Sequence, residues 1–448
     1  MDFILKIVFN VFIPLFALGI VVFVHELGHF VVARRNGITV EVFSVGFGPR
    51  ITGFNKKGTD YRISLIPFGG YVKFFGDDIE DEKARSLSGG FYAASPFIRT
   101  KACVAGPAMN ILFGFLLYCV VAITGKPVLT TELTTVVGGL PDNSPAMNAG
   151  MMAGDRILSI SGRKVSSWKE VVNSIVLSSE ETLDIRFERD AITKNLLITP
   201  IMDEKFGVRR IGILPMEKIA VWKVLEKSPA EKAGLKKGDQ IVSLNGKQVT
   251  QWDSLLKEVA DSQGKILSIG IIRDGRELKL DVIPQMNAEI GRVTIGFIRH
   301  YEFELMHPNP FKEVWNDIRN IFMTLRALIM KKVSAKGLAG PVGIIQIMGQ
   351  YASIGFIYFI SVLAMISINL GIINLFPIPV LDGGHILLNS VEQLRGKALG
   401  KRTMAVIQNI FVVLLIGLIL LVTYNDVLRW VKPWFSKEKV EEKVDVNK

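Results

Sequence analysis

The residues with the clearest chemical potential are two histidines and a glutamate near the start of the chain. They form the pattern His25-Glu26-Leu27-Gly28-His29. Side chains four positions apart share one face of a helix, so both imidazoles can reach one metal ion. Zinc prefers neutral histidine nitrogens, and Glu26 can take a proton from a water on that ion. The pattern therefore predicts a hydrolytic zinc site. The competing interpretation, two packing histidines and a buried glutamate, leaves three ionisable groups uncompensated in an apolar span.

A catalytic zinc needs a third protein ligand and one open position for water. The preferred candidate is Asp382, because Pro377 and Pro379 must interrupt a helix just before it. Irregular backbone at membrane depth is tolerated where it lines a cavity. We therefore expect Asp382 to be the third ligand, with His385 as the rival.

Four long apolar runs, at about residues 7–24, 102–124, 354–378 and 404–424, must position these groups. Each is long enough to cross a bilayer as a helix. The first could instead be a cleaved signal peptide, but no small-residue cleavage site follows it.

The mean hydropathy of +0.35 fits a membrane core combined with water-exposed domains. Cys103 and Cys119 lie in one run, too far apart along a helix to form a disulfide.

The orientation of the spans follows from basic residues, which gather in two short loops. These loops, between the first and second and between the third and fourth runs, should be cytoplasmic. Both termini and the long middle segment, with His300 and His307, then lie outside. His25, His29 and Asp382 meet near the cytoplasmic side. The net charge of +11 fits such anchors, and no nucleic-acid partner is expected. The loop residues are Arg34, Arg35, Arg50, Lys56, Lys57, Arg62, Lys73, Arg99 and Lys101, then Arg395, Lys397, Lys401 and Arg402.

The middle segment contains one module twice. Ser144-Pro145-Ala146 recurs 84 residues later as Ser228-Pro229-Ala230, and the match continues through Trp168 and Trp252. The pattern resembles bacterial PDZ domains, which bind a peptide as an added strand. Ile211-Gly212-Ile213, which lies ahead of the second copy, is a candidate loop for a peptide carboxylate; the alternative is that these domains only space or filter. An amphipathic helix is expected at about 311–332.

Beyond these residues, the chain resembles the site-2 protease family of intramembrane zinc metalloproteases over nearly its whole length. Besides the histidine motif, the resemblance rests on Leu381-Asp382-Gly383 in the third span and on PDZ modules between spans two and three. Further matching motifs are Phe47-Gly48-Pro49, Gly69-Gly70-Tyr71-Val72-Lys73, Ala105-Gly106-Pro107 with Asn110, and Gly340-Pro341-Val342-Gly343.

The resemblance implies roles for these residues. His25, His29 and Asp382 would bind zinc, Glu26 would be the general base, and Asn374 would hold the substrate backbone or an oxyanion. Residues 61–75, with Gly69, Gly70, Tyr71 and Val72, would form a membrane-reentrant β-loop that clamps an extended substrate. Substrates would be single-span proteins of the bacterial inner membrane already cut outside, such as an anti-sigma factor, and remnant signal peptides. The PDZ pair, facing the periplasm, would exclude substrates with an intact outer domain.

The expected fold is a multi-domain α+β membrane protein with four transmembrane helices, a reentrant β-loop and two extracytoplasmic PDZ domains. The main alternative function is a membrane-anchored PDZ scaffold or chaperone with a structural metal; a metal transporter is a second. The expected segments are 1–35 (first span), 36–100 (loop), 101–125 (second span), 126–207 and 208–290 (PDZ domains), 291–351 (connector), 352–390 (third span), 391–426 (loop and fourth span) and 427–448 (tail).

Overall fold

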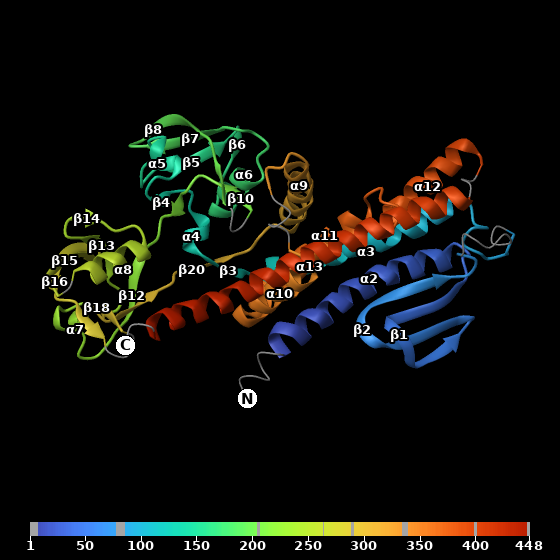
Figure 1. Ribbon diagram of the computed structural model, residues 1–448, viewed down its shortest axis with the longest axis horizontal. Coiled ribbons are helices and arrows are strands. Elements are labelled where there is room, and N and C mark those ends of the chain that lie inside the picture. Colours follow the sequence, from blue (N-terminus) through green and yellow to red (C-terminus); the bar gives the residue numbers. More distant parts are fainter. Residues whose placement is uncertain are drawn as a thin grey trace. The chain divides into compact units, whose positions relative to one another are not determined.

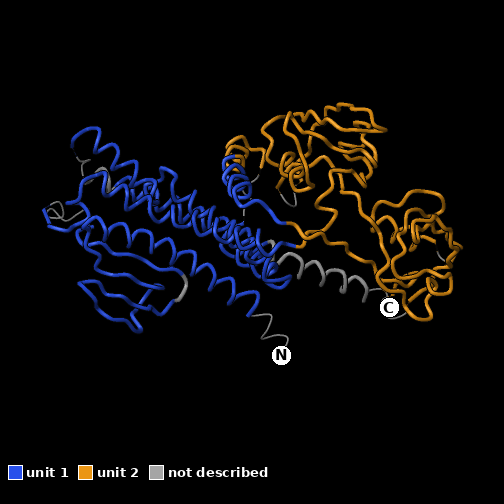
Figure 2. The backbone as a smooth tube through the Cα atoms, turned by 180° about the vertical axis from the view of Figure 1, so that it is seen from behind, with its two compact units in different colours: residues 1–126, 307–322, 338–448 blue, residues 127–306, 323–337 orange. Residues whose placement is uncertain are grey.

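The computed structural model describes residues 8–77, 86–203, 207–262, 264–287, 291–333, 339–397 and 401–445. The chain divides into two compact units (Figure 2). Unit 1 comprises Met1–Lys126, His307–Phe322 and Leu338–Lys448, and unit 2 comprises Pro127–Met306 and Met323–Gly337.

Unit 1 is built mainly from long apolar helices. Four segments are long and apolar enough to cross a membrane: Val8–Arg35, Pro96–Thr124, Phe356–Asn374 and Val406–Leu428. They confirm the four predicted apolar helices. The elements are η1 (Val8–Phe12), α2 (Ile13–Arg35), α3 (Pro96–Thr124), α10 (Pro341–Ile354), α11 (Phe356–Asn374), α12 (Asp382–Arg395) and α13 (Lys401–Asp445) (Figure 1).

Local sequence sets the ends of α3. Pro96 occupies the first turn, where its missing N–H costs nothing, and Oγ of Ser95 accepts a hydrogen bond from the amide of Ile98. The helix ends at Gly125, whose φ of 73° suits glycine. Cys103 and Cys119 both lie in α3 as free thiols.

Three helices of unit 1 approach one another closely through glycines. A Cβ on Gly28 of α2 would lie 2.3 Å from the carbonyl oxygen of Ala105 on α3. A Cβ on Gly371 of α11 would lie 2.8 Å from the carbonyl oxygen of Pro107. Small residues allow such backbone approach between spans. The helix carrying the two histidines is therefore held tightly against α3, and α3 against α11.

The chain breaks between α11 and α12, in the stretch that contains Pro377 and Pro379. It folds back over the start of α12, because a Cβ on Gly383 would lie 2.2 Å from the carbonyl oxygen of Phe376. A Cβ on Gly384 would lie 2.3 Å from that of Ile378. Only glycine fits at these two places. The two glycines after Asp382 therefore allow the chain to fold back closely enough to position the aspartate at the start of α12.

An ion pair fastens α12 to the start of α3. Arg99 is 1% exposed, and its Nη2 lies 2.9 Å from Oε1 of Glu392. Its Nε also donates to the carbonyl of Ala94. A buried charge is tolerated when it is paired and hydrogen-bonded in this way. The pair thus fixes the helix that begins at Asp382.

A twisted hairpin follows α2. Strand β1 (Val40–Lys56) pairs antiparallel with β2 (Thr59–Phe74), and the turn has positive φ at Lys57 and Gly58. Both strands bend, so the sheet consists of four paired segments. Their order across the sheet is 50–56, 59–64, 42–45 and 70–74. The segment 70–74 is therefore an edge of the sheet. The sequence indicated β structure at 61–75, but β1 was not anticipated.

The first module of unit 2 has a sheet in the order β6-β5-β7-β8 and a core that includes Val137, Ile157, Ile185 and Ile211. Its elements are β4 (Val137–Gly139), α5 (Pro145–Asn148), β5 (Arg156–Ile160), β6 (Arg163–Lys164), α6 (Trp168–Val176), β7 (Leu183–Arg189), β8 (Ile192–Ile198), β9 (Ile201–Asp203), β10 (Val208–Arg210) and β11 (Leu214–Pro215), which pairs with β4.

The second module repeats this plan, with a sheet in the order β16-β15-β13-β12-β19. Its core includes Ile219, Ile241, Ile269 and Ile295. Its elements are β12 (Ile219–Val224), α7 (Pro229–Lys232), β13 (Gln240–Leu244), β14 (Lys247–Gln248), α8 (Trp252–Asp261), β15 (Leu267–Arg273), β16 (Arg276–Val282), β17 (Gln285–Asn287), β18 (Arg292–Thr294) and β19 (Phe297–His300).

The border between the modules differs from the expected one at residue 208. Ile211 packs in the first core, and the amide of Ala146 donates to its carbonyl. Ile295, 84 residues later, packs in the second core in the same way, with the amide of Ala230 as donor. The segment Ile211-Gly212-Ile213 therefore completes the first module, because its apolar side chain closes that core.

The remaining elements join these parts along the chain. They are β3 (Lys126–Leu129), which pairs with β20 (Phe303–Met306), α4 (Thr130–Leu133), and α9 (Pro310–Ile329). Helix α9 occupies the region predicted to be amphipathic. Within unit 1, Tyr118 of α3 donates a 2.7 Å hydrogen bond to Asp317 of α9.

Candidate metal centre

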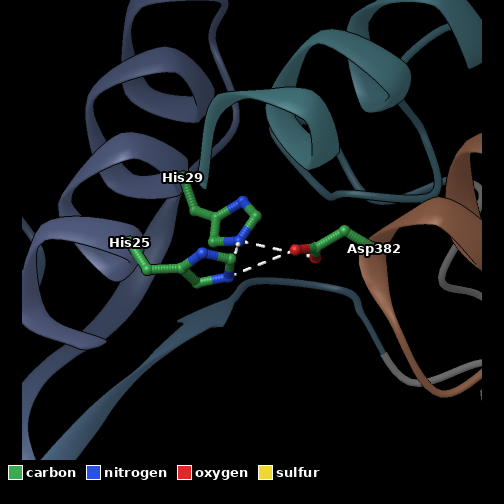
Figure 3. A group of neighbouring side chains, drawn as sticks. All are labelled: His25, His29 and Asp382. Carbon is green, nitrogen blue, oxygen red and sulfur yellow. Dashed lines mark hydrogen bonds and ion pairs between the residues drawn. The ribbon is translucent and has the colours of Figure 1, made fainter. Parts of the chain in front are cut away.

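His25 and His29 lie one turn apart on α2 and direct their rings to the same place. Their Nε2 atoms are 3.1 Å apart, and both residues are buried at 7% exposure. Asp382, the first residue of α12, faces them (Figure 3). Its Oδ2 lies 3.2 Å from Nε2 of His25, and its Oδ1 lies 3.4 Å from Nε2 of His29. The three side chains converge from segments more than 350 positions apart in the sequence.

These donor atoms fit a small divalent cation. Ligands at about 2.0–2.1 Å from one tetrahedral ion lie about 3.3–3.4 Å from one another. The separation of the two Nε2 atoms and the distance from each Nε2 to the carboxylate oxygen that it pairs with are close to this value. Three atoms that carry lone pairs otherwise repel each other in an apolar surrounding, and a cation removes that cost. Two imidazoles and one carboxylate suit zinc and leave one position of a tetrahedron open. Among the described residues, this is the group that can hold a metal ion.

The α3 helix supports both histidines. Nδ1 of His29 donates a 2.8 Å hydrogen bond to the carbonyl oxygen of Ala102, which leaves Nε2 free of a proton. Gly106 makes room for that ring, since a Cβ there would lie 2.3 Å from its Nε2. One turn further on, Nδ2 of Asn110 lies 3.3 Å from Nδ1 of His25. The resemblance assigned no role to Gly106 or Asn110. Both residues stand in the matching motif Ala105-Gly106-Pro107 with Asn110, and their spacing of four within an apolar span is the signal that places them on one face of α3.

Glu26 belongs to the same cavity but points to the β-hairpin. Its Oε2 accepts a 3.0 Å hydrogen bond from the amide of Val72. Val72 lies on the edge segment 70–74, and a Cβ on Gly70 would lie 3.7 Å from Cγ of Glu26. Gly69 faces the ring of Phe47, on which Tyr71 stacks at 6.2 Å. Of the hairpin residues that the resemblance singled out, Gly70 and Val72 therefore lie next to the glutamate, and Gly69 and Tyr71 lie against Phe47.

A cavity of about 340 Å³ contains these groups. His385 lines it but is not one of the three converging ligands, so geometry favours Asp382 over its rival. Asn374 ends α11, and its Nδ2 lies 3.4 Å from Nε2 of His25. The remaining wall contains aromatic and polar side chains that sequence reasoning did not identify, namely Phe74, Asp77, Phe91, Tyr92 and Cys103.

The other predicted residues lie elsewhere. His300 stacks on Trp222 in the second module, and His307 hydrogen-bonds to the carbonyl of Ala122. Ile211-Gly212-Ile213 lies in the first module, where a Cβ on Gly212 would lie 2.4 Å from Cβ of Ser144. None of these residues belongs to the metal-ligand group of the described chain.

The four apolar helices and the converging histidines and aspartate are features expected of a membrane-embedded, metal-dependent hydrolase. The family model described as Peptidase family M50 matches residues 13–418. The regulator of sigma-E protease RseP of Escherichia coli (strain K12) is 33% identical, covering 92% of this chain and 97% of the relative. A putative zinc metalloprotease of Vibrio cholerae is 31% identical, covering 94% and 99%. The PDZ domain of the SdrC-like protein from Listeria monocytogenes, a solved structure, covers 18% of this chain and 85% of its own, with 18% identity and a TM-score of 0.17.

The chain belongs to peptidase family M50, the site-2 proteases. It is therefore a metalloprotease of the intramembrane type, which agrees with the four apolar helices and with the converging histidines and aspartate.

Proposed function

We propose that this metalloprotease hydrolyses a peptide bond of single-span membrane proteins at the cavity that contains His25, His29 and Asp382. The observation that carries the proposal is the convergence of these side chains, 3.1–3.4 Å apart, between helices of membrane-spanning length. The alternative, a scaffold with a structural metal, needs a fourth protein ligand, and the described residues provide three.

His25, His29 and Asp382 would hold zinc through Nε2, Nε2 and the carboxylate. Zinc, when bound, supplies a Lewis acid that activates water and polarises the scissile carbonyl. Glu26 acts as the general base. Because Val72 occupies Oε2, the other oxygen, Oε1, is free to take a proton and to pass it to the leaving amine.

Asn374 positions the substrate. Its Nδ2 lies beside the ligand group and can donate a hydrogen bond to the carbonyl oxygen of the substrate or to the developing oxyanion. An amide donor adds no net charge to the site, so it does not compete with the cation for the ligands.

The hairpin clamps the substrate in an extended form. A transmembrane helix hides its peptide bonds, so it must unwind before water can attack. Segment 70–74 is a sheet edge beside Glu26, and an edge strand offers backbone groups to an added strand. Gly69, Gly70, Tyr71 and Val72 would contact that strand. The exposed apolar side chains of the hairpin, such as Ile51, Phe54 and Leu65, favour a membrane-reentrant position.

The two repeated modules would be PDZ domains in the periplasm. Basic residues in the two short loops support cytoplasmic loops, both termini outside, and a metal centre near the cytoplasmic side of the inner membrane. The modules would exclude substrates whose outer domain is intact, and Ile211-Gly212-Ile213 is the proposed carboxylate loop of the first. Because several relatives are named regulators of sigma-E, we propose an anti-sigma factor as substrate, and remnant signal peptides as a second class.

The test uses the purified full chain in proteoliposomes with a single-span reporter, either intact or truncated outside the membrane. We expect zinc-dependent cleavage of the truncated reporter by the parent and a rate about 10²–10⁴-fold lower for Glu26→Gln. A variant lacking residues 136–300, which removes both modules as the structure delimits them, should also cut the intact reporter. Equal cleavage by Glu26→Gln would contradict the catalytic assignment, and continued dependence on truncation would contradict the filter.

A further inference from the structure

We infer that Asn110 fixes the tautomer and orientation of His25 by accepting a hydrogen bond from its Nδ1–H, so that Asn110 is a positioning residue of the metal centre. The inference rests on the proposed metal site. It concerns a residue that touches neither the metal ligand atoms nor the substrate, and it gives a chemical reason for a carboxamide in the middle of an apolar span.

The carboxamide of Asn110 is fully buried and has one partner. The residue is 0% exposed, and its side-chain hydrogen-bond partner within the described chain is His25, whose Nδ1 lies 3.3 Å from Nδ2 of Asn110. Its Oδ1 is buried without a hydrogen-bond partner. Buried polar side chains usually have their hydrogen bonds satisfied, so an amide with a single partner marks that partner as the reason for its presence.

Helix packing alone does not explain the amide. Polar side chains in spans often link one helix to another. The link between α3 and α11 at this position is made by other atoms, since Oγ of Ser367 donates a 2.8 Å hydrogen bond to the backbone carbonyl of Asn110. The amide side chain is left to face α2, where it meets His25.

The chemistry of His25 decides which amide atom must face it. Its Nε2 is directed at His29 and Asp382, so in the metal-binding form the proton of the neutral ring is on Nδ1. An Nδ1–H needs an acceptor. A half-turn of the carboxamide exchanges its nearly isosteric oxygen and nitrogen, and this places Oδ1 opposite Nδ1.

The two histidines then have matching supports on one face of α3. The carbonyl of Ala102 accepts from Nδ1 of His29. Eight residues later the carboxamide of Asn110 lies 3.3 Å from Nδ1 of His25, and after the half-turn its Oδ1 would accept from that nitrogen. Between them, Gly106 leaves space for the ring of His29. Helices α2 and α3 pack against each other, and the order of the two supports along α3 is the reverse of the order of the two histidines along α2. Ligating histidines commonly donate their second ring N–H to such an acceptor.

The test measures zinc affinity by chelator competition on the purified full chain, together with the absorption spectrum of the Co²⁺ form. We expect Asn110→Leu and Asn110→Ala to weaken zinc binding about 10- to 100-fold. Asn110→Asp, which keeps an acceptor, should restore affinity to within about threefold of the parent and keep the parent's Co²⁺ bands.

Ser367→Ala is the matched control, because it removes a buried hydrogen bond to the backbone of Asn110 and leaves the side chain intact. Its zinc affinity should equal that of the parent. Thermal unfolding of the metal-free proteins monitors the fold, and the smaller Asn110→Ala replaces Asn110→Leu if the latter unfolds.

Zinc affinity equal to the parent's in the folded alanine or leucine variant would overturn the inference. So would an aspartate variant as weak as the alanine variant. A parent protein that binds no zinc would instead overturn the proposed metal centre, which is a separate result.

Discussion

The backbone amide of Val72 donates a hydrogen bond of 3.0 Å to Oε2 of Glu26. The contact joins the edge of the β-hairpin to the helix that carries both histidines. It fixes one carboxylate oxygen and leaves the other for chemistry. It also places the strand proposed to bind substrate beside the proposed general base, so that movement of the hairpin would change the position of Glu26.

This contact makes Glu26→Gln an informative variant. The carbonyl oxygen of glutamine can accept the same hydrogen bond from Val72, so the hairpin should keep its place. Glutamine cannot accept a proton at neutral pH. We expect the cleavage rate to fall by about 10²–10⁴-fold, since that is the usual contribution of a general base.

The controls for Glu26→Gln are zinc content and hairpin position. Elemental analysis should give parent-like zinc, and limited proteolysis near 57–58 should be unchanged. Loss of zinc along with activity would indicate that Glu26 is a ligand and not a base.

Asp382 and His385 share the cavity, and substitution separates their roles. Asp382→Ala removes one of three converging ligands, so bound zinc should fall to a fraction of the parent's content. His385→Ala should retain zinc, because its imidazole is outside the ligand group. Both are measured by elemental analysis after purification without added metal. The reverse pattern, zinc lost only in His385→Ala, would make His385 the third ligand.

Local patterns in the sequence predicted the positions of the spans and of the repeated module. Long uncharged runs have few alternatives to a membrane helix. In the second module Asn245-Gly246 forms a turn in which both residues have positive φ, the conformation that Asn and Gly favour. The same repeat did not reveal that Ile211 belongs to the first module, because a single apolar residue packs equally well on either side of a border until the cores are seen.

The neighbours of the metal centre were harder to predict than its candidate ligands. His25, His29 and Asp382 carry chemistry in their side chains and stand out in apolar surroundings. The sequence gives no sign that the backbone carbonyl of Ala102 binds His29, since every residue has a backbone carbonyl. Strand β1 was missed because its exposed and buried residues do not alternate regularly, and its pairing with two parts of β2 depends on a bend.

Each module contains an arginine that binds a buried aspartate and a backbone carbonyl, here called the arginine clamp. Because the modules are repeats, we expect the two clamps to behave alike. Arg189 binds Asp155 and the carbonyl of Gly150, and Arg273 binds Asp239 and the carbonyl of Gly234. Asp239 is 1% exposed, so Arg273→Met leaves a buried carboxylate without its charged partner. We expect the second module to lose about 2 kcal/mol of local stability.

Hydrogen–deuterium exchange on the full chain measures this loss for Arg273→Met, with faster exchange in peptides covering 229–244. Arg276→Met, an exposed substitution three residues away, is the control and should leave exchange unchanged. Arg189→Met should act in the same way on 145–160. Unchanged exchange in both clamp variants would mean that the cores alone hold these loops.

Gly106 gives the sharpest steric test of the metal centre. A Cβ at this position would lie 2.3 Å from Nε2 of His29 and 2.6 Å from its Cε1, so the ring cannot keep its place beside an alanine. The ring must turn or α2 must move from α3, and either change separates Nε2 of His29 from Asp382. Since a helix tolerates alanine better than glycine, the fold gains propensity while the centre loses a ligand. We therefore expect Gly106→Ala to remain folded and to lose about 10- to 100-fold in zinc affinity.

Gly417→Ala is the control, because a Cβ there meets nothing within 4 Å. Chelator competition measures both variants. Parent-like zinc binding by Gly106→Ala would show that His29 can reach the ion from another position, and the packing of α2 on α3 would then not be what forms the site.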